Sequence, residues 1–94
     1  GSTGFLMGRI LNAQGQYRQA RPYLKDALRI RIAKLPAGHP SIAGAYYELG
    51  FNYFHDNQFN EAKTMLQNAQ EMFRELKDEK ILTKTEALLE QLKK

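Results

Sequence analysis

The sequence matches itself when it is shifted by 42 residues. Small residues fall on small residues, and large apolar residues fall on large apolar ones. The matched pairs include Gly8 and Gly50, Ala20 and Ala62, Leu24 and Leu66, and Ala27 and Ala69. A fixed period of this length is typical of helical repeat proteins, in which each unit buries its apolar face against its neighbours. The sequence therefore predicts two copies of one structural unit.

Apolar residues within each unit follow helical spacing. In the second unit one stripe has steps of three and four residues, formed by Phe59, Ala62, Leu66, Ala69, Phe73 and Leu76. This spacing predicts an amphipathic helix. Turn and end signals divide the rest of the chain into further helices, because proline suits a first helical turn and short polar segments favour turns. The helices are predicted at about 3–13, 17–35, 40–56, 59–76 and 78–94.

These helices suggest a division of the chain. We interpret residues 1–3 as a remnant of a cloning vector, which would mean that the natural N-terminus has been removed. Residues 4–39 and 40–77 are predicted to be two helical hairpins. Residues 78–94 have one apolar and one charged face, which is what the open end of a helical stack needs for closure.

Seven residues of the second unit form a pattern: Tyr46, Leu49, Gly50, Tyr53, Ala62, Leu66 and Ala69. In this pattern the unit resembles a tetratricopeptide repeat, with its first aromatic residue, leucine-glycine pair, tyrosine and small residues of the second helix. The first unit matches less fully, since Gly4 replaces the first aromatic residue and Met7-Gly8 replaces the leucine-glycine pair. The 42-residue period and the segments 19–30 and 38–43 are similar to the kinesin-light-chain subtype.

The resemblance covers about residues 4–76. It implies an all-α fold, a right-handed α-α superhelix of two hairpins with a C-terminal capping helix. It also implies a non-catalytic scaffold or adaptor that binds another protein.

A second apolar stripe on the first helix of the second unit is the candidate binding site. Tyr47, Phe51 and Phe54 share one helical face, and the resemblance places that face on the concave side of the stack. We expect it to bind a partner peptide or helix through apolar anchors, with polar side chains setting the register. The candidate residues are Phe5, Leu6, Arg9, Asn12, Tyr47, Glu48, Phe51, Phe54 and His55.

Two alternatives remain open. The aromatic stripe could instead be buried by the closing helix, by a neighbouring repeat of a longer array or by a second copy of the chain, making a homo-oligomer. A basic surface is the other alternative, because residues 1–41 carry seven basic residues and one acid, a net charge of +6. Its partner would be nucleic acid or an anionic membrane. The basic side chains form only a loose stripe: Arg18, Arg21, Lys25, Arg29 and Lys34.

No pattern in the sequence indicates catalysis, a cofactor or a metal. The two histidines, His39 and His55, stand 16 residues apart, there is no cysteine, and no glycine-rich phosphate loop is present. His39 is expected to stabilise a helix start, and Asp78 is expected to cap the last helix. No apolar run approaches the roughly 18 residues that span a bilayer. The lack of cysteine fits a reducing compartment, so we expect a cytoplasmic location.

Overall fold

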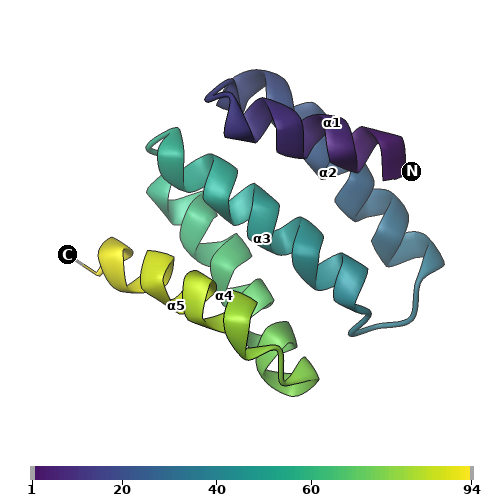
Figure 1. Ribbon diagram of the computed structural model, residues 1–94, viewed down its shortest axis with the longest axis vertical. Helices are drawn as coiled ribbons and strands as arrows, with labels where there is room; N and C mark the ends of the chain where they lie inside the picture. The colour runs from purple at the N-terminus through teal and green to yellow at the C-terminus, as the bar shows by residue number, and fades with distance from the viewer. Residues whose placement is uncertain (1, 94) are drawn as a thin grey trace.

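The computed structural model describes the backbone of residues 2–93 and the side chains of residues 4–93. It contains five helices and, within the described residues, no strand. They are α1 (Ser2–Ala13), α2 (Tyr17–Lys34), α3 (Pro40–His55), α4 (Phe59–Leu76) and α5 (Glu79–Leu92) (Figure 1). The predicted all-α repeat fold is confirmed, and each helix begins and ends within one or two residues of its predicted bounds. A vector remnant was expected at residues 1–3. Gly1 and the side chains of residues 2 and 3 lie outside the described part of the chain, so this expectation is not tested.

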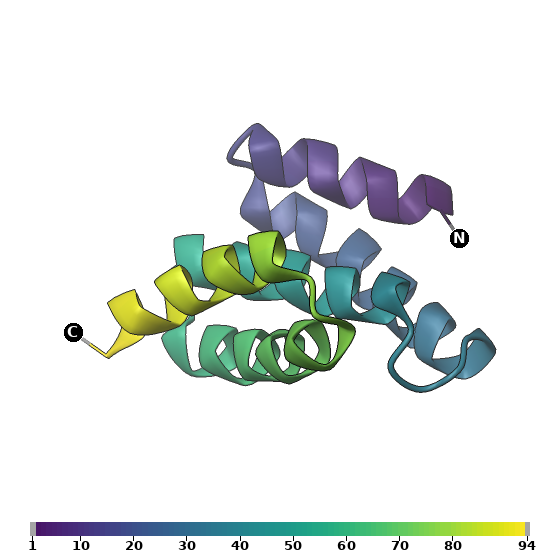
Figure 2. The same ribbon diagram turned by 60° about the horizontal axis from the view of Figure 1, so that its bottom comes forward.

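The helices stack in chain order, each against the next (Figures 1 and 2). α1 and α5 also each touch α3, which therefore lies between them on one side of the molecule. The core runs through the stack and is made of small and branched apolar residues with two aromatic rings. Its buried members are Ala20, Leu24, Ala27, Ile42, Ala43, Ala45, Leu49, Tyr53, Ala62, Leu66, Ala69 and Phe73.

The turns inside the two hairpins repeat one geometry. Gly15, between α1 and α2, has a φ of 80°, and Asn57, 42 residues later between α3 and α4, has a φ of 63°. Both lie in the left-handed region, which glycine adopts freely and asparagine tolerates better than most residues. The two turns therefore reverse the chain in the same way, and each hairpin is antiparallel.

Two helix starts are capped by the residues that the sequence indicated. The His39 Nδ1 accepts a hydrogen bond of 3.0 Å from the Ser41 N–H, and Pro40 is the first residue of α3. The Asp78 Oδ1 accepts a longer bond of 3.5 Å from the Ile81 N–H at the start of α5. Both predicted capping roles are confirmed. His39 thus has a local structural role and does not contribute to a site.

Glycine lets the helices of each hairpin approach closely. An ideal Cβ atom placed on Gly8 would lie 2.6 Å from Leu24 Cδ2, and one placed on Gly50 would lie 2.6 Å from Leu66 Cδ2. Leu66 is fully buried and its backbone N would lie 3.3 Å from the same Cβ, so it has little room to move. Gly44, also within α3, has nothing within 4 Å of such a Cβ.

Alanine substitutions at these two glycines of α3 should therefore change stability in opposite directions. Gly50→Ala should lower the free energy of unfolding by about 1–3 kcal/mol, because the methyl group overpacks the contact with Leu66. Gly44→Ala should raise it by about 0.5–1 kcal/mol, because alanine is the better helix former. Urea unfolding followed by circular dichroism measures both. Changes of the same sign in the two variants would contradict this account of the hairpin contact.

Candidate functional site

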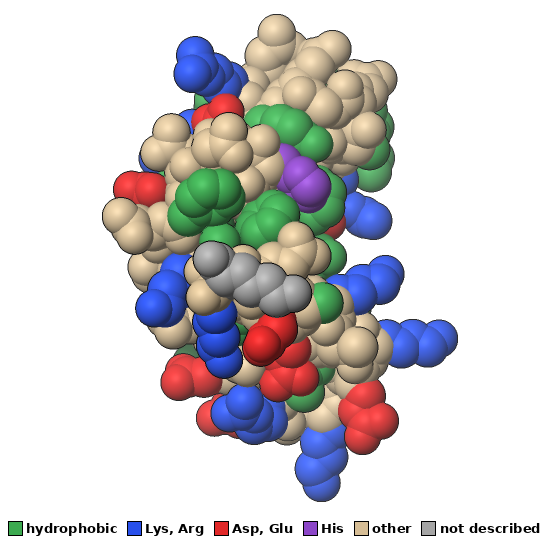
Figure 3. Space-filling model, turned by 90° about the vertical axis from the view of Figure 1, so that its left-hand side faces the viewer, with side chains coloured by type: hydrophobic (Ala, Val, Ile, Leu, Met, Phe, Trp, Pro, Cys, Tyr) green, Lys and Arg blue, Asp and Glu red, His purple; other side chains and the backbone are tan. Residues whose placement is uncertain are grey.

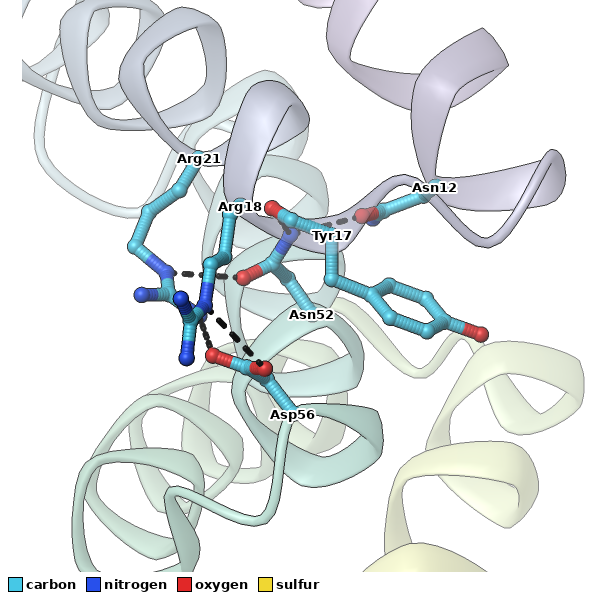
Figure 4. A network of polar contacts seen from close by, with 6 residues as sticks. All are labelled: Asn12, Tyr17, Arg18, Arg21, Asn52 and Asp56. Carbon is cyan, nitrogen blue, oxygen red and sulfur yellow. Dashed lines mark hydrogen bonds and ion pairs between the residues drawn. The ribbon is translucent and has the colours of Figure 1, made fainter.

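A buried asparagine joins the first hairpin to the second (Figure 4). Asn52 in α3 is fully buried, and its Nδ2 donates to the Asn12 Oδ1 in α1 at 2.8 Å and to the Tyr17 carbonyl at the start of α2 at 2.7 Å. Its Oδ1 accepts from the Arg21 Nε at 2.9 Å. One amide is thus bonded to both helices of the preceding hairpin, which holds α1 and α2 at a set position against α3.

The same network ends in an ion pair. The Arg21 Nη2 donates to the Asp56 Oδ2 at 2.7 Å, and the Arg21 Cζ lies 4.6 Å from the centre of the Tyr53 ring. The Arg18 Nε lies 3.9 Å from the other oxygen of Asp56. No buried side-chain nitrogen or oxygen among the described residues lacks a partner, as expected for a polar cluster that stabilises the fold.

A groove runs along α3 between α1 and α5. It consists of two adjoining hollows of about 470 and 280 Å³. The first is lined by Leu6, Arg9, Ile10, Asn12, Ala13, Tyr47, Glu48, Phe51 and Lys84. The second is lined by Phe5, Arg9, Gly44, Tyr47, Glu48, Phe73, Ile81 and Lys84. Since four residues line both hollows, we treat them as one site, the α1–α3–α5 groove.

Some charged side chains in this groove have a partner of opposite charge, and one does not. The Glu48 Oε2 accepts from the Asn12 Nδ2 at 3.2 Å, and the Glu48 Oε1 lies 3.6 Å from the Arg9 Nε. Burial raises the pKa of the Glu48 carboxyl above its ordinary value, although the Asn12 hydrogen bond and the Arg9 charge act to lower it. Lys84 makes no ion pair with any residue between 4 and 93. A ligand in the groove would therefore meet two cationic side chains and one partly neutralised acid.

Burial and the nearby Glu48 charge raise the pKa of the Tyr47 hydroxyl above its ordinary value. Tyr47 therefore stays neutral near pH 7, and it presents an apolar ring with a hydroxyl that can donate or accept a hydrogen bond. Together with Phe51 and Leu6, it supplies aromatic and aliphatic surface in the first hollow. Large apolar contacts with a few polar groups around them are typical of binding sites for peptides and small molecules.

The candidate residues from the sequence fall into two places in the structure. Six of them line the first hollow of the groove: Leu6, Arg9, Asn12, Tyr47, Glu48 and Phe51. Phe5 lines the second, where its ring also stacks under the Arg31 guanidinium, with 3.9 Å between the Arg31 Cζ and the ring centre. Asn12 is almost fully buried, so its amide serves the fold as well as the groove wall.

Phe54 and His55 line neither hollow and belong to a neighbouring aromatic cluster. The His55 ring stacks on Tyr17, with ring centres 5.4 Å apart, and lies 4.3 Å from Phe51 and 5.1 Å from Phe54. Phe59, which is half exposed, extends the cluster from Phe54 at 6.0 Å. Figure 3 shows hydrophobic side chains around a histidine on this end of the molecule. Phe51 is shared, so the cluster continues the groove toward the turns of the hairpins.

A comparison with models of known protein families identifies the family of this chain. The model described as Tetratricopeptide repeat matches residues 3–75. The chain belongs to the tetratricopeptide-repeat family. No curated protein and no solved structure matches the chain. Tetratricopeptide repeats are in general protein–protein interaction modules and are typically non-catalytic, which agrees with the expectation drawn from the sequence.

Some groove residues of this tetratricopeptide-repeat protein were not among the sequence candidates. Ile10 and Ala13 follow Leu6 at steps of four and three, so helical spacing alone could have added them. Gly44 stands seven residues before Phe51 on the same helix, but a glycine has no side chain to signal a binding face. Lys84 comes from α5, and no local pattern indicates that this helix reaches the groove.

Two further observations concern metal binding and membrane crossing. The described residues contain no group of three or more histidine, cysteine or acidic side chains that could hold a metal ion. None of the described helices combines the length and apolar character that a bilayer crossing requires.

Replacing Asn52 by alanine should strongly destabilise the protein. The change leaves the Arg21 Nε, the Asn12 amide and the Tyr17 carbonyl without their buried partner. The free energy of unfolding should therefore fall by about 1–3 kcal/mol. Asn68→Ala is the matched control, because the Asn68 amide bonds only the Thr64 carbonyl of its own helix near the surface. The control should stay within about 0.5 kcal/mol of the parent in urea unfolding. Similar losses in both variants would show that the network does not hold the hairpins together.

The raised pKa of Glu48 predicts how stability depends on pH. The folded state disfavours the ionised carboxylate, so this residue lowers stability above its folded pKa, and the penalty disappears as pH falls below the ordinary value of 4.5. Glu48→Gln should therefore be more stable than the parent at pH 7. The difference should shrink as the pH is lowered and vanish below about 4.5, as thermal unfolding at several pH values will show. A glutamine variant that is less stable at pH 7 would mean that the Arg9 contact outweighs burial.

Proposed function

We propose that this protein is a non-catalytic adaptor that binds a segment of a partner protein, as a peptide or a helix, in the α1–α3–α5 groove. The observation that supports this most directly is the groove itself. Its aromatic surface, Tyr47 and Phe51, faces an open space between three helices and is only half buried. Half-buried aromatic side chains in a recess, with polar groups at the edge, are typical of the anchor sites of protein interfaces.

The polar groups around the groove are suited to orienting a bound peptide. Arg9 is exposed for more than half of its side chain, and Lys84 approaches the same space from the opposite wall. Such groups contribute to register and specificity, while the apolar contacts supply most of the binding free energy. The aromatic cluster around His55 extends this surface beyond Phe51, so the proposed site keeps all nine sequence candidates, with Phe54 and His55 at its outer end.

Finer features of the proposal rest on the sequence. The 42-residue period and segments 19–30 and 38–43 support a kinesin-light-chain-like subtype. The absence of cysteine supports a cytoplasmic location. We also retain the division into hairpins 4–39 and 40–77 and a capping helix 78–94, because α5 lies against α4 much as α3 lies against α2.

The basic surface is less favoured as a binding site. Of the five basic residues proposed for it, Arg18 and Arg21 pair with Asp56, and Arg29 pairs with Asp26. Charges that are already paired attract phosphate groups less strongly than free ones.

Peptide selection tests the proposed site. Helical and extended peptides would be selected on the parent protein from a displayed library, and the affinity of each selected peptide would then be measured by calorimetry. Tyr47→Ala and Phe51→Ala should each weaken binding by at least about tenfold, because interface aromatic residues contribute most to affinity. Tyr23→Ala, which removes a half-exposed tyrosine outside the groove, is the matched control and should bind as the parent does.

A third groove variant fills the groove instead of emptying it. Gly44→Leu places a side chain in the second hollow, where a Cβ meets nothing within 4 Å, so binding should fall while stability is kept. Selected peptides that bind all three groove variants, Tyr47→Ala, Phe51→Ala and Gly44→Leu, with the parent's affinity would refute the proposal. Loss of helical circular dichroism in the alanine variants would show that the aromatic stripe is core.

A further inference from the structure

Hydrogen bonds run in one direction from the contact between the hairpins to the groove. The Arg21 Nε can only donate, so the oxygen of the Asn52 amide must face it, at 2.9 Å. The Asn52 Nδ2 then donates to the Asn12 Oδ1 at 2.8 Å (Figure 4). This leaves the Asn12 Nδ2 to donate to Glu48, at 3.2 Å to its carbonyl and at 3.2 Å to its Oε2. The side-chain oxygen and nitrogen of both asparagines are therefore assigned by Arg21 at the start of this chain of bonds.

The Asn12 bond holds one carboxylate oxygen of Glu48 and leaves the other without a hydrogen bond. The Glu48 Oε1 lies 3.6 Å from the Arg9 Nε, which is beyond hydrogen-bond distance, and it accepts no hydrogen bond from residues 4–93. The Glu48 side chain is 19% exposed and lines both hollows of the groove. Because Asn12 is buried and holds the carboxylate from behind, the free oxygen is preorganised at the groove surface.

The surroundings of Glu48 limit what its free oxygen can bind. Burial raises the pKa of the Glu48 carboxyl, so the Asn12 bond and the Arg9 charge do not fully offset the loss of water around the ionised form. A hydrogen bond from a ligand would add to that compensation. Arg9 and Lys84 line the same two hollows, so a further cation would meet two positive charges at close range. A neutral N–H or O–H group meets no such repulsion.

We propose that Glu48 is a specificity-determining residue of the groove, which accepts a hydrogen bond at Oε1 from a neutral N–H or O–H group of the partner segment. Asn12 is the positioning residue that holds Glu48 for this bond. The inference rests on the proposed function, because it concerns the same groove. An acceptor fixed in direction supplies a selectivity that the aromatic contacts lack, since apolar contacts are not directional.

Glu48→Gln tests the polarity of this position. Asn12 donates, so it holds the oxygen of the new glutamine, and the glutamine NH2 group then replaces the free carboxylate oxygen. A donor would thus face the donor of the partner. The affinity of peptides selected on the parent protein, measured by calorimetry, should fall by at least about tenfold. Glu86→Gln is the matched control: Glu86 lies on α5 outside the groove, where its Oε2 accepts from the Gln70 Nε2 at 3.1 Å, and the variant should bind as the parent does.

The double variant Asn12→Asp/Glu48→Gln should restore binding. One oxygen of the new aspartate accepts from Asn52, and the other accepts from the glutamine NH2 group, so the glutamine oxygen faces the groove again. The double variant also keeps the net charge of the parent. Its affinity for the selected peptides should return to within about threefold of the parent's. A second substitution in the same wall would not restore affinity if Glu48 only supported the shape of the groove.

Binding should also depend on pH. An ionised carboxylate accepts a stronger hydrogen bond than a protonated one, so a bound partner should lower the pKa of Glu48. Affinity should therefore fall as the pH is lowered through the pKa of the free protein, which lies above the ordinary value of 4.5. The other titratable side chains that face this space are Arg9 of α1, Tyr47 of α3 and Lys84 of α5. Arginine, tyrosine and lysine do not ordinarily titrate in this range. In Glu48→Gln the same peptide should show only its own titration.

Several results would overturn the inference. One is a Glu48→Gln variant whose affinity stays within about threefold of the parent's. Another is a folded double variant that binds no better than Glu48→Gln. If the double variant does not fold, the pH comparison decides, and an equal loss of affinity at low pH in the parent and in Glu48→Gln would overturn the inference. Peptides that depend on Tyr47 and Phe51 but not on Glu48 would overturn this inference alone, whereas peptides that depend on none of the three would also refute the proposed function.

Discussion

The position of the first hairpin against the second depends on the buried amide of Asn52. A buried amide without partners would be strongly unfavourable, and this one finds partners only when α1 and α2 lie at one position against α3. Apolar contacts alone tolerate small shifts between helices, whereas directional hydrogen bonds do not. The network therefore sets the register between the two hairpins. Since α1 forms one wall of the groove, the width of the groove depends on the same bonds.

Contacts within a hairpin and contacts between hairpins have different chemistry. Inside each hairpin a glycine on one helix accepts a leucine of the other, at Gly8 and Leu24 and again at Gly50 and Leu66. Between the hairpins the apolar core continues, since Ala20 and Leu24 share one cluster with Leu49 and Tyr53, and a network of polar groups lies beside it. Asn12 serves both the hairpin interface and the groove, since its Oδ1 accepts from Asn52 while its Nδ2 donates to Glu48. The groove is therefore built on the inter-hairpin contact.

The basic half of the chain illustrates how composition can mislead about surfaces. Arg21 is held by Asn52 and Asp56, and Arg31 stacks on Phe5 while its Nη1 donates to the Ser41 carbonyl at 2.7 Å. Both guanidinium groups connect the first hairpin to the second. Arginine suits this role because its planar group can form several hydrogen bonds and stack on a ring at the same time.

The sequence by itself determined the elements of this protein: five helices, their capping residues His39 and Asp78, and the glycines of the hairpins. These depend on periodicity and on bonds between near neighbours, which a local pattern records. Only the tertiary structure decided that Asn12 meets Asn52, 40 residues away, that Lys84 reaches the groove, and that Phe54 and His55 lie beside it. Helical spacing shows which residues share a face, but the neighbour that covers that face depends on how whole helices pack.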